Sequence, residues 1–323
     1  MKTISRQEKI HSRPGFFRLR LATAGLLFFA AAGLAATAIR PPKLPWAVPT
    51  VRVGHSPGGA ALDPATNTVY VGNEFSNSLS LIDGSKCNAT DSSGCKAIAT
   101  IDIGRQPIVV LFDPTTRTVY VTLRGGHNNT IAVVNAATCN ATNTSGCGHA
   151  RVATVTVPGT VCVGPADVCG PAVPALDAAN HSLYIGDAKD GRVSIVNTAT
   201  CNGTDTLGCS QSPVLAATKG DSIAIDHSNH SVYVSDFSRQ LVSVFDGTTC
   251  NAIDQSTCGR PPAATFAEDL IPLGPAVVDE TTHTYYLPLS AFNDVLDYVA
   301  VIDASTCNAT NTSAVEIRRQ ESR

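Results

Sequence analysis

The sequence predicts an all-β protein, a β-propeller built of four-stranded blades, and three observations carry this prediction. A unit of about 50 residues recurs five times along the chain. Each unit holds short runs rich in Val, Ile, Thr and Tyr, separated by turns of Gly, Asn, Asp and Pro. No segment after the N-terminal leader shows a helical period. Four strands per repeat of this length are typical of a propeller blade, whereas the repeats of a β-solenoid are usually shorter.

The first strand of each unit is an apolar run that ends in aspartate. These residues are Asp63, Asp113, Asp177, Asp226 and Asp279, with spacings of 50, 64, 49 and 53 residues. An aspartate at a turn accepts hydrogen bonds from nearby backbone N–H groups, so we expect a structural role and not a catalytic one. Three histidines of the same turn are expected to be exposed: His181, His230 and His283.

Three further runs complete each unit. The second strands are expected at residues 69–73, 119–123, 183–187, 232–236 and 285–289. The third strands are expected at residues 79–83, 131–135, 193–197, 241–246 and 299–303. Fourth strands are clear at residues 97–103 and 152–157, and weaker at 213–218 and 263–267.

The fifth unit has three good strands and then stops. Residues 49–54 resemble a fourth strand such as residues 99–104. We therefore expect this N-terminal strand to pair with residues 298–303, to close the last blade and to hide a strand edge that would otherwise invite aggregation. That closure gives five blades, although the tail at residues 313–319 competes for the same place.

The segments Asp63-Pro-Ala-Thr-Asn-Thr-Val-Tyr-Val-Gly-Asn73 and Asp113-Pro-Thr-Thr-Arg-Thr-Val-Tyr-Val121 carry a family resemblance. The pattern resembles the bacterial YVTN β-propeller repeats over about residues 50–305. The resemblance implies a surface or extracytoplasmic propeller, in a family whose relatives serve as binding scaffolds, lactonase-like enzymes and lyases. Such propellers often have more than five blades, so a truncated seven-blade parent stays an alternative.

Eight cysteines form four pairs with the same C-x7-C spacing, each between a third and a fourth strand. The pairs are Cys87/Cys95, Cys139/Cys147, Cys201/Cys209 and Cys250/Cys258. Their repeated position predicts disulfides, because metal sites usually show C-x2-4-C pairs. Cys162 and Cys169 are expected to form a further bridge in an insert at residues 158–171. Cys307 has no mate, since Val315 stands there; truncation, a free thiol and an intermolecular bridge all fit.

The N-terminus reads as an export segment. Residues 1–20 are basic, an uncharged run follows from Leu21 to Ile39, and Ala36-Thr37-Ala38 is a cleavage pattern for signal peptidase. We therefore assign residues 1–38 as a signal peptide or signal anchor, 39–47 as a Pro-rich linker, 48–305 as the propeller and 306–323 as a tail. Cleaved or anchored, the domain is expected outside the cytoplasm.

Charge excludes nucleic acid as an expected partner. The formal net charge of the whole chain is −3. Removal of residues 1–38 takes away six basic residues and one acidic residue, which leaves 17 basic against 25 acidic residues, a net charge of −8. An acidic domain gains no affinity from the phosphate backbone.

Functional residues are expected where the repeat is broken, on the loops that share one propeller face. The candidates are His55, Glu74, Arg105, Arg124, His127, Asp187, Lys189, Asp236, Arg239 and Asp269. Solvated loop tips are the plainer interpretation of all of them. Glu74, His127, Asp187 and Asp236 are the set that a metal-dependent lactonase could use. The chain holds no nucleophile elbow, zinc-protease motif, P-loop or dinucleotide fingerprint, so we predict no catalytic residue and no metal ligand.

These observations favour an exported, non-enzymatic binding scaffold that engages a protein, glycan or cell-envelope component through one face. The alternative is a lactonase- or lyase-like enzyme with a divalent cation at the central channel. No cofactor is expected under the first hypothesis. We expect a monomer that meets a membrane only through an uncleaved N-terminal segment.

Overall fold

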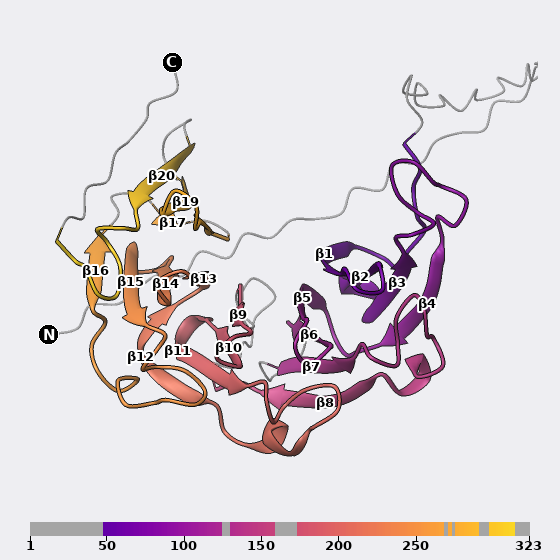
Figure 1. The fold of residues 1–323 in the computed structure, drawn as a ribbon, viewed down its shortest axis with the longest axis horizontal. Helices are drawn as coiled ribbons and strands as arrows, with labels where there is room; N and C mark the ends of the chain where they lie inside the picture. Colours follow the sequence, from indigo (N-terminus) through magenta and orange to yellow (C-terminus); the bar gives the residue numbers. More distant parts are fainter. Residues whose placement is uncertain are drawn as a thin grey trace, which may run out of the picture. The chain divides into compact units, whose positions relative to one another are not determined.

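The computed structural model describes residues 48–124, 130–158, 173–267, 271–272, 275–290 and 297–313. These residues are all-β, with short 3-10 turns and no α-helix. Their strands form five antiparallel sheets, which follow one another in chain order, one per sequence repeat (Figure 1). Within these ranges, which do not include the expected export segment, no helix has the length and apolar character needed to cross a membrane.

The first two sheets are regular four-stranded meanders. The first contains β1 (Pro57–Asp63), β2 (Thr68–Asn73), β3 (Ser78–Asp83) and β4 (Ala97–Asp102), with the 3-10 turn η1 (Glu74–Ser76). The second contains β5 (Pro107–Asp113), β6 (Thr118–Leu123), β7 (Thr130–Asn135) and β8 (Arg151–Thr156), with η2 (Cys147–His149). Both inner strands carry a bulge near their start, in the segments 57–60 and 107–110.

The third and fourth sheets repeat this meander. The third contains β9 (Ala175–Asp177), β10 (Ser182–Ile185), β11 (Asp187–Asn197) and β12 (Val214–Gly220), with η3 (Leu207–Ser210). The fourth contains β13 (Ser222–Asp226), β14 (Ser231–Asp236), β15 (Leu241–Asp246) and β16 (Ala264–Ala267). Strands β12 and β16 confirm the two weakest fourth strands predicted from the sequence.

The fifth sheet differs from the others. It contains β17 (Ile271–Pro272), β18 (Val277–Asp279), β19 (Thr284–Ser290) and β20 (Asp297–Asp303). Strands β17 and β18 pair end to end along one edge of β19, and β20 pairs along the other edge. The sheet is therefore three strands wide, and β20 has no second partner among the described residues.

The expected pairing of residues 49–54 with residues 298–303 is wrong. Residues 49–54 form no strand, and β20 pairs with β19 alone in the part of the chain that the structure describes. The segment is held by its own sheet instead, because the Gly54 N–H donates to Asn73 Oδ1 at 3.1 Å and the His55 N–H donates to Ser76 Oγ. The competing tail, from residue 314 onward, lies outside the described residues.

The core consists of four apolar layers, each between two successive sheets. Residues alternate across every strand, so each sheet has two faces. We call the face toward the preceding sheet the leading face, as with Val119 and Val121 of the second sheet, and the opposite face the trailing face. The trailing face of each of the first four sheets packs on the leading face of the next, in four separate clusters of buried side chains.

The repeat aspartates take the predicted role. The Ala65, Thr115, Ala179, Ser228 and Thr281 backbone N–H groups donate to the aspartate two residues earlier, at 2.8–3.0 Å. The last turn position has a positive φ in every repeat, at Asn67, Arg117, His181, His230 and His283. The three histidines are half-buried, not exposed as expected; His283, for example, lies against Ser228 and Asp226 of the preceding sheet.

Candidate functional site

Six of the predicted binding residues are described with their side chains, and they lie along one edge of the sheets, where first strands begin and second strands turn into third strands: His55, Glu74, Arg105, Arg124, Asp236 and Arg239. We call this edge the loop edge. The Glu74 N–H donates to Ser56 O at 2.9 Å, and the Arg124 N–H donates to Gln106 O at 3.0 Å. In the fourth sheet the Phe237 N–H donates to Asp221 Oδ2 at 2.8 Å. Each bond ties the loop before the first strand to the turn after the second, so both loops share this edge.

The first sheet presents an aromatic and acidic group at the loop edge. The His55 and Phe75 rings lie 5.5 Å apart, centroid to centroid, and tilted by 42°. Phe75 remains 58% exposed, which leaves one side of its ring to solvent. Glu74 is half-buried beside it. A histidine and an aromatic ring in contact form a small platform with an adjacent carboxylate.

The second sheet presents positive charge at the same place. Arg105 is exposed and Arg124 is half-buried, and the backbone bond between Arg124 and Gln106 keeps their two loops together. No described side chain forms an ion pair with either guanidinium. Both guanidinium groups therefore have no carboxylate partner within the part of the chain that the structure describes.

Asp236 and Arg239 of the fourth sheet bind each other. The Arg239 Nε donates to Asp236 Oδ2, while the Ser238 hydroxyl and the Arg239 N–H donate to Asp236 Oδ1. Burial raises the pKa of Asp236, but the bonds from Arg239 and Ser238 outweigh burial and leave the pKa below its ordinary value. This carboxylate stabilises its own turn and has no free oxygen aimed at a ligand.

The other candidates are not placed with them. His127 and Asp269 lie outside the described residues, and Asp187 and Lys189 are described only through the backbone of β11. Apart from Asp236 with Arg239, no bond joins two of the candidate side chains among the described residues. The same ranges contain no group of three His, Cys, Asp or Glu side chains able to hold a metal ion.

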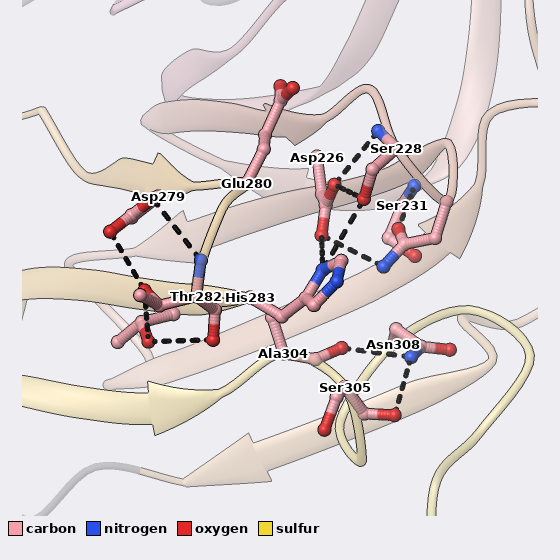
Figure 2. Close-up of polar contacts among 12 residues, drawn as sticks. Asp226, Ser228, Ser231, Asp279, Glu280, Thr282, His283, Ala304, Ser305 and Asn308 are labelled. Atoms are coloured by element: carbon pink, nitrogen blue, oxygen red, sulfur yellow. Dashed lines mark hydrogen bonds and ion pairs between the residues drawn. The ribbon is translucent and has the colours of Figure 1, made fainter.

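The opposite edge, where first strands end, holds a cluster that the sequence did not single out (Figure 2). His283 of the fifth sheet points toward Asp226 of the fourth, with Nδ1 at 3.9 Å from Asp226 Oδ2 and 3.4 Å from Ser228 Oγ. The Ser228 hydroxyl donates to Asp226 Oδ1. Serine, histidine and aspartate therefore lie within one cluster.

The geometry of this cluster does not match a nucleophilic triad. A triad places the serine and the carboxylate on opposite ring nitrogens of the histidine. Here Ser228 and Asp226 both approach Nδ1 of His283. The second sheet has the same hydroxyl-to-aspartate bond, from Thr115 Oγ1 to Asp113 Oδ1 at 2.6 Å, so this bond belongs to the repeated turn. The cluster joins the fourth and fifth sheets and does not have the geometry of a nucleophilic triad.

Beside it, His227 and Glu280 form a bridge between the fourth and fifth sheets. The His227 Nδ1 lies 2.7 Å from Glu280 Oε1, and the His227 N–H donates to the same oxygen. Partial burial lowers the pKa of His227, but its contacts with Glu280 and with the Leu176 carbonyl outweigh burial and raise the pKa above 6.5. The same bonds hold the pKa of Glu280 below 4.5. The signal missed in the sequence is that both residues directly follow a repeat aspartate.

We expect Glu280→Gln to lower the pKa of His227, measured by titrating its ring resonances in NMR. In the wild-type protein, the contribution of His227 to the free energy of unfolding is complete below pH 6.5. It is lost as the pH rises through the raised pKa of this histidine. The contribution of Glu280 to the free energy of unfolding is present above pH 4.5 and is lost as the pH falls through the lowered pKa of this glutamate. The free energies of unfolding of the wild type and of the Glu280→Gln variant should therefore differ most between pH 4.5 and pH 6.5. An unchanged His227 pKa, with His149 as internal reference, contradicts the bridge.

Two surface depressions lie away from the loop edge. One, of about 200 Å³, is lined by Ala217, Arg260 and Pro262 among others, where the fourth disulfide loop meets β12. The other, of about 350 Å³, lies between β4 and η2 and includes Asp102 and His149. Both are set between outer strands and disulfide loops, and neither includes a residue of the predicted binding face.

The four repeated cysteine pairs are confirmed as disulfides. The S–S distances are 2.04 Å for Cys87–Cys95, 1.99 Å for Cys139–Cys147, 2.04 Å for Cys201–Cys209 and 2.15 Å for Cys250–Cys258. The Cys162–Cys169 bridge lies outside the described residues. The repeat position of the pairs therefore predicted their connectivity correctly wherever the structure describes both cysteines.

Cys209 was predicted as a disulfide cysteine, and the structure confirms its bridge to Cys201 and also gives it a packing role. It is 5% exposed and belongs, with Cys201 and Tyr120, to the apolar layer between the second and third sheets. It lines neither of the two depressions. The 3-10 turn η3, which contains Cys209, packs against β8 of the preceding sheet. This disulfide is therefore part of the core as well as a bridge across a loop.

Cys307 is a buried free thiol. Burial raises its pKa to about 11, with a smaller contribution from Asp303. Such a thiol is protonated and unreactive at neutral pH.

No protein-family model matches the chain, and no curated protein matches it either. Its fold is similar to a solved structure from Desulfotomaculum acetoxidans DSM 771, which is described as a functionally unknown protein. The TM-score is 0.55 at 14% sequence identity, over 83% of this chain and 70% of the other. At this identity the similarity concerns the fold alone.

Proposed function

We propose that this protein is an exported β-propeller-type scaffold that binds a protein, glycan or cell-envelope component through its loop edge, without catalysis. The observation that carries the proposal is the constancy of the loop-edge backbone beside the variety of its side chains. Equivalent backbone bonds hold the loops of the first and second sheets, yet one displays His55 with Phe75 and the other Arg105 with Arg124. A rigid frame with variable loop chemistry is the usual arrangement of a binding surface.

Two further observations support the class and the location. The Asp-Pro-x-Thr-x-Thr-Val-Tyr-Val repeats resemble those of YVTN propellers, and five antiparallel sheets that follow one another in chain order support a fold of this type. Four disulfides are compatible with an oxidising, extracytoplasmic compartment. Export through the N-terminal segment is part of the same proposal.

The test is a pull-down from envelope extract with the full chain, with and without a chelator. We expect Phe75→Ala and Arg105→Glu each to reduce capture of a partner by about tenfold, because exposed aromatic and arginine side chains contribute most to interfaces. Leu207→Ala and Arg260→Glu are the matched controls, since Leu207 is exposed within a disulfide loop and Arg260 is exposed just after one. Capture that is equal in all four variants contradicts a loop-edge site. Capture that disappears with chelator favours the divalent-cation alternative.

A further inference from the structure

Successive sheets are locked together by one repeated hydrogen bond. A tyrosine in the second strand of each of the first four sheets donates to the carbonyl of the first loop cysteine of the next sheet. The bonds are Tyr70 to Cys139 (2.8 Å), Tyr120 to Cys201 (2.7 Å), Tyr184 to Cys250 (3.1 Å) and Tyr233 to Cys307 (2.8 Å). All four tyrosines are buried.

A second bond accompanies each of these contacts. The residue two positions after the loop cysteine donates its backbone N–H to the hydroxyl at the start of the second strand of the preceding sheet. The bonds are Ala141 to Thr68 (2.7 Å), Gly203 to Thr118 (2.7 Å), Ala252 to Ser182 (2.8 Å) and Ala309 to Ser231 (2.9 Å). The lock therefore has a tyrosine half, on the earlier sheet, and a loop half, on the later sheet.

The fifth sheet has the residues of a tyrosine half and the first sheet has those of a loop half, but neither half forms these hydrogen bonds within the described residues. Tyr286 and Thr284 are the tyrosine half on the fifth sheet, and the Tyr286 hydroxyl has no hydrogen-bond partner among the described residues. Cys87 and Ala89 are the loop half on the first sheet. Cys87 is half-exposed and Ala89 exposed, whereas the four other leading loop cysteines are buried.

Two apolar faces also have no sheet packed on them among the described residues: the leading face of the first sheet and the trailing face of the fifth. Leu62 lies on the leading face of the first sheet, opposite Val69, and is 53% exposed. Its counterpart in the second sheet, Phe112, packs into the layer between the first two sheets. Val299, on the trailing face of the fifth sheet, is 52% exposed. The ends therefore carry the same two kinds of face that pack together four times inside the molecule.

Polar contacts between the turns of successive sheets follow the same pattern, with one member left without a partner sheet at each end. Arg117 of the second sheet reaches Asp63 of the first at 3.1 Å, and His283 of the fifth approaches Asp226 of the fourth. Asp279, the corresponding aspartate of the fifth sheet, has bonds only within its own turn. Asn67 holds the corresponding turn position of the first sheet, and its amide can donate to a carboxylate.

We propose that a second copy of this chain docks head to tail on the first, with the leading face of its first sheet on the trailing face of the other's fifth sheet. Cys87 and Ala89 of one copy then meet Tyr286 and Thr284 of the other, and Asn67 meets Asp279. The interface is heterologous, because each copy contributes a different end. It needs no ligand at the loop edge.

The segment before the first sheet fits the same arrangement. Residues Thr50 to Pro57 repeat the pattern of Thr100 to Pro107, which contains the end of β4 and the connection to β5. In the same way β4 leads directly into β5, and β12 leads directly into β13. When the first sheet of a second copy docks on the fifth, its residues 49–53 lie where the strand missing beside β20 belongs.

The experiment measures the mass of the purified full chain in solution by light scattering across a concentration series. We expect the wild type to form dimers or larger species. Val299→Asp and Leu62→Asp should each weaken self-association by about tenfold or more, because every contact then buries a carboxylate. Both side chains are half-exposed in one copy, so the folded monomer tolerates the change. Ile253→Asp, at 66% exposed and away from both ends, should associate like wild type.

Mixing the two end variants gives the decisive result. A 1:1 mixture of the Val299→Asp and Leu62→Asp chains has one native pair of ends, since each chain keeps the end that the other lacks. At a concentration where each variant alone is monomeric, we expect the mixture to form a dimer and nothing larger. A wild type that is monomeric throughout overturns the proposal, and so does association that both variants retain or a mixture that stays monomeric.

Discussion

Replacing Tyr120 by alanine is expected to lower the free energy of unfolding by about 3–5 kcal/mol, because the change removes a fully buried aromatic ring and leaves a cavity between the second and third sheets. It also leaves the Cys201 carbonyl without its donor. Tyr120→Phe keeps the ring and removes only the hydroxyl, so we expect a loss of about 1–2 kcal/mol. Urea denaturation of the three proteins measures both differences.

Tyr286 is the matched control, because it holds the same repeat position in the fifth sheet but is half-buried and lacks the bond. Tyr286→Phe should leave the stability of the monomer within about 0.5 kcal/mol of wild type. If Tyr120→Phe and Tyr286→Phe cost the same, the tyrosine-to-carbonyl bond does not stabilise the contact between sheets.

Replacing Cys139 and Cys147 together by serine is the second large effect. Opening this loop of about nine residues costs roughly 2.5 kcal/mol in the chain-entropy model. The variant should lose more than that, because the loop also places the Cys139 carbonyl that accepts from Tyr70 and the Ala141 N–H that donates to Thr68. Urea denaturation under non-reducing conditions measures the loss.

The Cys87/Cys95 double variant is the control for this effect. Its disulfide closes a loop with the same sequence separation of 8, but this loop touches no preceding sheet, so its loss should stay near the chain-entropy value. Mild reduction followed by alkylation and mass spectrometry should label Cys87 and Cys95 before Cys139, which is fully buried. Equal losses and simultaneous labelling contradict the difference between the two loops.

The strands, turns and four disulfides could be predicted because their signals are local. Asp63 binds the Ala65 N–H within its own turn, and Cys87 and Cys95 lie eight residues apart, so the repeat pattern alone identified the roles of these three side chains. The loop-edge residues were predicted only as a set, and the structure separates them. It pairs Asp236 with Arg239 and places His55 on Phe75, because these contacts depend on side-chain directions that no spacing specifies.

The sequence by itself determined the all-β class, the five units and the place of the disulfides. Only the tertiary structure decided which units meet and which ends stay open. Tyr120 and Tyr286 hold equivalent positions in their repeats, yet Tyr120 is buried under the loop of the next sheet, whereas no loop among the described residues covers Tyr286. Contacts between residues some 70 to 80 positions apart depend on which sheet comes next. The expected closure by residues 49–54 failed for the same reason, because their own first sheet holds them.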